Sequence, residues 1–176
     1  AQTRHPGVRL TESLPDDHVE RCFKLAEKYF PCNQKIYNDN NCWWNYQGDY
    51  TPVYSLVKTL MEHGCQVDGL GLQYHMFANM LNDNAIGFNR PLSPRAVWRA
   101  LDQYAKLNIP LNMSEVSLLS CRSLGDGDEF QALALERLYR LWFSHPATEA
   151  IIWWNLVDGT AAYAPMGSEE GENRLR

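Results

Sequence analysis

Residues 66–75 read QVDGLGLQYH, and the order of elements around this stretch decides the fold class. We predict a strand over residues 66–73, because the helical pattern before it closes at Gly64. That helix opens at Thr51-Pro52, and its apolar residues recur at helical spacing from residue 53 to residue 60. A helix followed directly by a strand is one step of an alternating α/β chain.

The same alternation extends in both directions from this strand. The predicted helices are residues 16–30, 51–64, 93–105 and a segment carrying apolar residues from 130 to 142; the predicted strands are residues 34–38, 66–73, 109–114 and 150–154. This order predicts parallel strands joined by helical crossovers. A complete (β/α)₈ barrel takes about 250 residues, so four strands indicate either a small open α/β sheet or half of a TIM barrel.

Composition limits the class of protein. The 176 residues are 45% hydrophobic and 21% charged, which predicts a single domain spanning 1–176, with loop segments at 1–15 and 165–176. The net charge of −5 and the absence of a Lys/Arg cluster argue against a nucleic-acid or anionic-membrane partner. No apolar run reaches the roughly 18 residues that a membrane span needs, and the amino end carries no apolar signal region.

The five cysteines form no CxxC pair, and their number is odd. Neither a zinc site nor a disulfide framework is therefore predicted. We expect most of them to be packing residues or free thiols.

Polar or aromatic residues stand where each predicted strand ends. These residues are Asn38 and Asp39, then Gln73 and His75, then Glu115, then Trp153 and Trp154. In parallel α/β folds the carboxyl ends of the strands share one edge, so a site is expected there. Taken singly, His75 is also typical of a packing or loop residue, Asn38 and Asp39 of a turn, and Glu115 of a solvated strand end.

Four segments, taken in order, resemble the family 10 glycoside hydrolases, the β-1,4-xylanases. They are IYNDNN at 36–41, VDGLGLQYH at 67–75, SEV at 114–116 and WNLVD at 154–158. The resemblance covers residues 19–158 and implies strands five to eight of that family's (β/α)₈ barrel, with their helices. It further implies a retaining enzyme, secreted or periplasmic, that cleaves xylan or related β-1,4-glycans with no metal or organic cofactor.

The resemblance also assigns roles to single residues. Glu115 resembles the family's nucleophile, and His75 resembles the histidine beside it. Gln73 matches the other residue of the strand-six pair, while Asn38 and Asp39 match the strand-five Asn-Asp. Trp154 matches the tryptophan that packs on the sugar ring. In this interpretation a carboxylate attacks the anomeric carbon, an imidazole orients it and an indole covers the sugar's apolar face.

Two departures from the family pattern affect the expected function. Ser117 stands where the family usually has an aspartate that orients the histidine, and no Asn-Glu pair matching the family's acid/base residue precedes Asn38. The chain is therefore expected to be the carboxyl-terminal half of a barrel, needing an amino-terminal half or the rest of a longer polypeptide. The alternatives are a non-catalytic carbohydrate-binding or assembly subunit on the same scaffold, and an open α/β domain of unrelated function.

Overall fold

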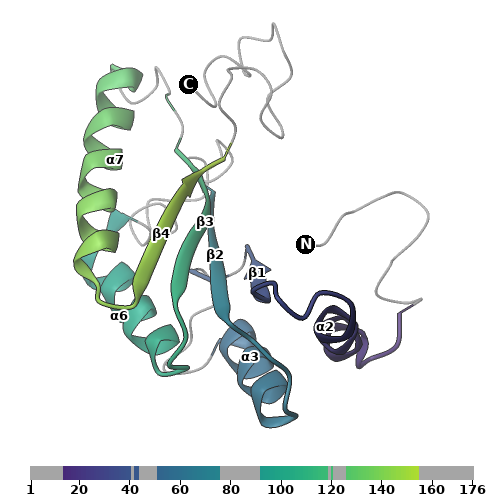
Figure 1. The fold of residues 1–176 in the computed structure, drawn as a ribbon. Coiled ribbons are helices and arrows are strands. Elements are labelled where there is room, and N and C mark those ends of the chain that lie inside the picture. Colours follow the sequence, from purple (N-terminus) through teal and green to yellow (C-terminus); the bar gives the residue numbers. More distant parts are fainter. Residues whose placement is uncertain are drawn as a thin grey trace, which may run out of the picture.

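The computed structural model describes residues 14–40, 42–43, 51–75, 92–118, 120 and 126–154, and helices and strands alternate along them (Figure 1). In chain order the elements are α2 (His18–Tyr29), β1 (Ile36–Asp39), α3 (Pro52–Glu62), β2 (Gly69–His75), α6 (Pro94–Ala105), β3 (Leu111–Ser117), α7 (Gly127–Ser144) and β4 (Thr148–Trp153). The four strands form one sheet in the order β1-β2-β3-β4, and every neighbouring pair is parallel. The α/β alternation and the parallel sheet predicted from the sequence are confirmed.

Capping residues set where the helices begin. The Thr51 hydroxyl accepts a hydrogen bond from the Tyr54 amide at 3.0 Å, with Pro52 at the first helical position of α3. The Asp126 carboxylate accepts from the amides of Asp128 and Glu129, both at 3.1 Å, and so begins α7. Both helices thus start at residues that offer an acceptor to free backbone N–H groups.

Alternate residues of strand β2 lie on two different faces of the sheet, one packed against helices and the other polar. Leu70, Leu72 and Tyr74 are fully buried. The Tyr74 ring contacts the Trp142 ring of α7 edge-on, with 5.0 Å between the ring centroids. Helix α6 contacts β3 and α7, and α7 contacts β4 (Figure 1). Because side chains alternate along a strand, Gly71, Gln73 and His75 point away from this helical layer.

The strand bounds differ from those that the hydrophobic pattern predicts, and β2 and β3 end later. β2 continues to His75 rather than Gln73, and β3 continues to Ser117 rather than Ser114, while β4 covers Thr148–Trp153 rather than 150–154. The polar residues at the ends of the predicted strands lie inside the ladder. Their side chains occupy the open face of the sheet, which is the face that none of the described helices covers (Figure 1). The loops predicted at 1–15 and 165–176 fall outside the described residues, except for Leu14 and Pro15, which belong to no helix or strand.

Candidate active site

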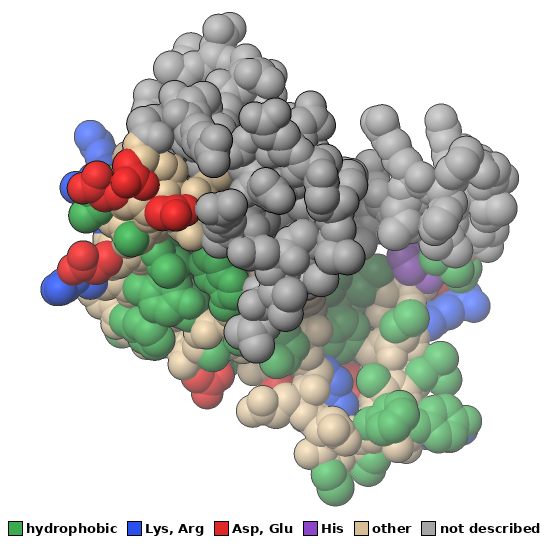
Figure 2. Space-filling model, turned by 90° about the horizontal axis from the view of Figure 1, so that it is seen from above, with side chains coloured by type: hydrophobic (Ala, Val, Ile, Leu, Met, Phe, Trp, Pro, Cys, Tyr) green, Lys and Arg blue, Asp and Glu red, His purple; other side chains and the backbone are tan. Residues whose placement is uncertain are grey.

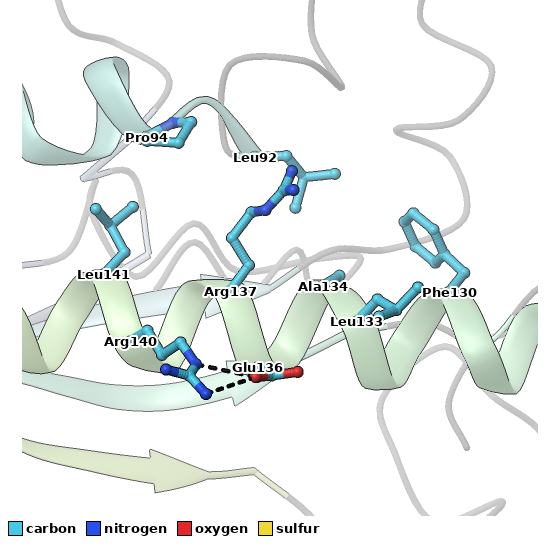
Figure 3. A pocket seen from close by; sticks show the side chains of 9 residues that line it. All are labelled: Leu92, Pro94, Phe130, Leu133, Ala134, Glu136, Arg137, Arg140 and Leu141. Carbon is cyan, nitrogen blue, oxygen red and sulfur yellow. Dashed lines mark hydrogen bonds and ion pairs between the residues drawn. The ribbon is translucent and has the colours of Figure 1, made fainter.

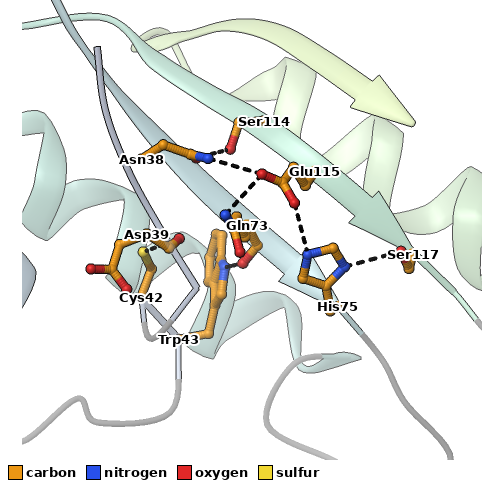
Figure 4. A network of polar contacts seen from close by, with 9 residues as sticks. All are labelled: Asn38, Asp39, Cys42, Trp43, Gln73, His75, Ser114, Glu115 and Ser117. Carbon is orange, nitrogen blue, oxygen red and sulfur yellow. Dashed lines mark hydrogen bonds and ion pairs between the residues drawn. The ribbon is translucent and has the colours of Figure 1, made fainter. Parts of the chain in front are cut away.

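The Glu115 carboxylate is the centre of a polar network on the open face of the sheet (Figure 4). Its Oε1 accepts hydrogen bonds from Asn38 Nδ2 at 2.9 Å and from Gln73 Nε2 at 2.8 Å. Its Oε2 lies 3.2 Å from Nε2 of His75. The carboxylate is on β3, and its hydrogen-bond partners come from β1 and β2. The Glu115 side chain keeps 24% of its surface exposed.

The register of the sheet produces this convergence. Asn38 of β1 lies opposite Gly71 of β2, and Gln73 lies opposite Glu115 of β3. A register shift between Gly71 and Gln73 brings Glu115, rather than Ser114, level with Gln73. This irregularity aims the carboxylate at both polar side chains of β2.

His75 is held between two side chains of β3. Its Nδ1 lies 3.0 Å from the Ser117 hydroxyl, and its side chain is only 10% exposed. Burial lowers the pKa of His75 below its usual 6.5, although the contact with Glu115 opposes this shift. A neutral imidazole carries one N–H. Since an ionised carboxylate only accepts, Nε2–H donates to Glu115 and Nδ1 accepts from Ser117.

Trp154 and Asp39 differ in their relation to this network. The Trp154 ring contacts the His75 ring edge-on, with 4.9 Å between centroids. Trp153 instead packs against the hydrophobic core.

Asp39 accepts a hydrogen bond from the Tyr37 hydroxyl at 2.9 Å and lies apart from Glu115 in Figure 4. Burial, followed by the nearby Asp39 charge, raises the pKa of Tyr37 above its ordinary range.

Trp43 and Ser114, to which no role was assigned from the sequence, also contact this network. Trp43 donates from Nε1 to the Gln73 carbonyl at 2.9 Å and meets Tyr74 edge-on at 5.3 Å. Ser114 donates to Asn38 Oδ1 at 2.5 Å. Trp43 follows β1 by a few residues in a polar segment, so the sequence gives no periodic signal for its position.

Nothing in the described residues points to a metal or a disulfide. They contain no group of three His, Cys, Asp or Glu side chains placed to hold a metal ion. Cys22 and Cys32 are exposed free thiols, Cys42 and Cys65 are buried free thiols, and Cys121 lies outside the described residues. Burial, reinforced by Asp39, raises the pKa of the Cys42 thiol, which keeps it protonated at neutral pH.

Other surfaces of the molecule lie away from Glu115. A hollow of about 700 Å³ runs along α7 in the helical layer (Figure 3); its lining residues are Leu92, Pro94, Phe130, Leu133, Ala134, Glu136, Arg137, Arg140 and Leu141. On the face in Figure 2 the visible Lys and Arg side chains are scattered rather than gathered into one basic patch. Among the described helices, none has the length and apolar character required to cross a membrane.

The sequence pattern of glycosyl hydrolase family 10 matches residues 4–166, which is most of the chain. The chain belongs to glycosyl hydrolase family 10. The family 10 resemblance described from the sequence motifs is thereby confirmed, and the four parallel strands with their helices match about half of a family 10 TIM barrel.

Two relatives illustrate the range of proteins to which this sequence is similar. Endo-1,4-beta-xylanase B of Thermotoga neapolitana is 26% identical over 83% of this chain and 39% of its own length. Anti-sigma-I factor RsgI6 of Acetivibrio thermocellus is 30% identical over 75% of this chain and 15% of its own length. The chain thus spans less than half the length of either relative.

The fold is also found among solved structures. An intracellular xylanase from Thermoanaerobacterium saccharolyticum, a mutant of which was solved with xylotriose, matches with a TM-score of 0.68 at 20% identity. The match covers 89% of this chain and 45% of that xylanase. At this identity the match shows a shared fold.

Proposed function

We propose that this chain supplies the nucleophile half of a retaining endo-β-1,4-xylanase, with Glu115 as the nucleophile. The observation that carries the proposal is the convergence of three donors, from Asn38, Gln73 and His75, on the Glu115 carboxylate. These donors hold the carboxylate in one orientation on the open face of the sheet. The Glu115 side chain is 24% exposed, so the anomeric carbon of a bound sugar can come into contact with the oriented carboxylate.

The chemistry would proceed in two displacements. A Glu115 oxygen attacks the anomeric carbon while the bond to the leaving glycosidic oxygen breaks, giving a covalent glycosyl-enzyme intermediate. A second carboxylic acid, about 5 to 5.5 Å away in retaining enzymes, protonates the leaving oxygen and later activates the water that releases the sugar. In the described residues the partners of Glu115 are two amides and an imidazole, so we place the acid/base carboxyl in the other half of the barrel.

The order of the motifs supports assigning β1–β4 to strands five to eight of the barrel, its carboxyl-terminal half. The outer side of β1 is an unpaired edge in the described sheet. Next to it lies a groove of about 330 Å³ that includes Phe23, Phe30 and Ile36. Phe30 and Ile36 are 61% and 43% exposed, so a preceding strand and helix would cover apolar surface here.

If the chain needs the other half of the barrel, residues 1–176 alone should be unstable or should associate. Without the amino-terminal half, supplied by another fragment, a second copy or a longer polypeptide, residues 1–176 should not behave as a stable monomer. We expect sedimentation and thermal unfolding to show association or a broad transition. A monodisperse monomer with a sharp, cooperative melt would contradict the half-barrel proposal.

The substrate is proposed to be xylan or a xylo-oligosaccharide. The similar Thermoanaerobacterium structure contains xylotriose. The Trp154 indole lies beside His75, where its face could cover a sugar bound at Glu115. Asp39 and Gln73 complete the proposed substrate contacts. We also propose a secreted or periplasmic location, which is what the family resemblance implies.

The test is made on an assembled barrel. The chain is co-expressed with the amino-terminal half of the Thermotoga neapolitana relative, and hydrolysis of xylan and of an aryl xylobioside is followed. Glu115→Gln should remove turnover of both substrates, because an amide keeps the shape but is a poor nucleophile. Glu149→Gln, which alters an exposed carboxylate on β4, is the matched control and should leave turnover unchanged.

A second function is favoured by two observations. Ser117 occupies the position where the family usually has an aspartate, and one relative is an anti-sigma-I factor rather than a xylanase by name. A non-catalytic carbohydrate-binding or assembly subunit would bind xylohexaose in calorimetry. In that case the assembled barrel would hydrolyse neither substrate, and Glu115→Gln would affect binding alone.

A further inference from the structure

Asn38 is the least confined of the three groups that donate to Glu115. It is exposed and lies on β1, the edge strand of the described sheet. Gln73 and His75, by contrast, lie on β2 between two neighbouring strands. A second contact must therefore fix the Asn38 amide if it is to present the same atom to Glu115 throughout the reaction.

The Ser114 hydroxyl makes this second contact. It donates to Asn38 Oδ1 at 2.5 Å, while Asn38 Nδ2 donates to Glu115 Oε1 at 2.9 Å (Figure 4). The ionised carboxylate only accepts hydrogen bonds, so the NH₂ group of Asn38 must face it. The amide oxygen is then left for a donor, and Ser114 supplies one.

Gly71 makes the contact between these two strands possible. Asn38 is on β1 and Ser114 is on β3, so their side chains meet across β2, above Gly71. A Cβ at position 71 would lie 2.5 Å from Asn38 Oδ1, 3.0 Å from Ser114 Oγ and 3.1 Å from Ser114 Cβ. Any side chain at this position would therefore push the two residues apart.

We propose that Ser114 is a positioning residue for Glu115, acting through the Asn38 amide in the space that Gly71 leaves open. This inference rests on the proposed function of Glu115. It assigns to Ser114 no contact with the substrate. The hydroxyl fixes which end of the Asn38 amide faces the carboxylate, and so preserves one of its three hydrogen bonds.

The primary test compares two substitutions of Ser114 in the assembled barrel. The readout is the rate at which Glu115 is labelled by a 2-fluoro xylobioside bearing a dinitrophenolate leaving group, which needs little acid assistance. Ser114→Ala should slow labelling about tenfold, because the Asn38 amide loses the hydrogen bond that orients it toward the Glu115 carboxylate. Ser114→Thr keeps the hydroxyl and should stay within about twofold of the parent rate. Equal rates for Ser114→Ala and the parent would overturn the proposal.

A double-mutant cycle tests whether Ser114 acts through Asn38. Asn38→Ala should slow labelling, and adding Ser114→Ala to it should cause no further loss, because the amide through which Ser114 acts is already absent. Additive losses would show that Ser114 works by another route and would contradict the proposal. Thermal unfolding of each variant separates a loss of folding from a loss of positioning.

Gly71→Ala and Gly69→Ala form a matched pair on β2. A Cβ at Gly69 would meet Ile36 Cγ1 and the Pro110 carbonyl only at 3.5 Å, which is ordinary contact. Gly71→Ala should slow labelling at least as much as Ser114→Ala, and Gly69→Ala should not. Similar rates for the two glycine variants would contradict the role of the open space.

The two proposals fail in different ways. If Glu115→Gln is labelled as fast as the parent, the proposed function is wrong whatever Ser114 does. If Glu115→Gln is inert while Ser114→Ala labels at the parent rate, Glu115 remains the nucleophile and only the positioning role is wrong.

Discussion

The two faces of β2 are built from alternating residues of one short strand, and they serve different purposes. Leu70, Leu72 and Tyr74 are fully buried in the core, where they contribute to folding. Gln73 and His75 face away from the helices and contact Glu115, and Gly71 leaves the space in which Asn38 meets Ser114. The comparison shows that a strand can anchor the fold and position a site independently, because side-chain alternation separates the two tasks.

The largest expected effect is on the packed face. Leu72→Ala, in the assembled barrel, should lower the free energy of unfolding by about 2 to 5 kcal/mol, because it removes a fully buried side chain and leaves a cavity. Chemical denaturation measures the change. A loss below about 1 kcal/mol would mean that this face of β2 is not the core of the folded domain.

The neighbouring residue should show the opposite pattern. Gln73→Ala removes the 2.8 Å hydrogen bond to Glu115 and should reduce kcat/KM by about 10- to 100-fold, equivalent to about 1.5 to 3 kcal/mol of transition-state stabilisation. The free energy of unfolding should change far less than in Leu72→Ala. If Gln73→Ala destabilised the fold as strongly and spared turnover, the division between the two faces would be wrong.

Ser117→Asp should alter the electrostatics of the open face. A carboxylate beside Nδ1 favours the protonated imidazole, so the pKa of His75 should rise relative to the parent. NMR titration of the His75 ring protons follows this change, and Ser117→Asn, which adds an amide of similar size without charge, is the control. A pKa that rises equally in both variants would exclude charge as the cause.

The smallest effect is a dependence of stability on pH. Burial lowers the pKa of His75 from 6.5 in the folded state. As the pH falls from about 6.5 through this lowered value, the unfolded chain takes up a proton that folded His75 does not, so the folded state loses stability. The other histidines are common to parent and variant, and His75→Gln should therefore show a shallower loss over this window. Parallel curves for the two proteins would contradict a buried, neutral His75.

The strand over residues 66–73 was predictable from the sequence, whereas most contacts on its open face were not. Apolar periodicity and the Thr51-Pro52 helix start are local signals. The helices and the alternation of helices and strands along the chain follow from such signals. The Gly71/Gln73 register shift depends on pairing with β3, and the contact between Asn38 and Ser114 depends on three strands at once. Local pattern contains neither kind of information.

The strand ends show the same limit. A hydrophobic pattern stops at the first polar residue, yet Gln73 and Glu115 are internal to their strands because the open face accepts polar side chains. Motif resemblance selected Asn38, Gln73, His75 and Glu115, which the structure joins by hydrogen bonds. It also selected Asp39, which accepts a hydrogen bond from Tyr37 on the same strand and whose contact with substrate stays a prediction.

The central claim is that Glu115 is the group that attacks the sugar. The most direct measurement is peptide mass spectrometry of the assembled barrel after reaction with the dinitrophenyl 2-fluoro xylobioside, because the trapped sugar marks the attacking residue. We predict one added fluoroxylobiosyl group, on Glu115, and no label in Glu115→Gln. A label on any other residue of either half, or undiminished labelling of Glu115→Gln, would contradict it.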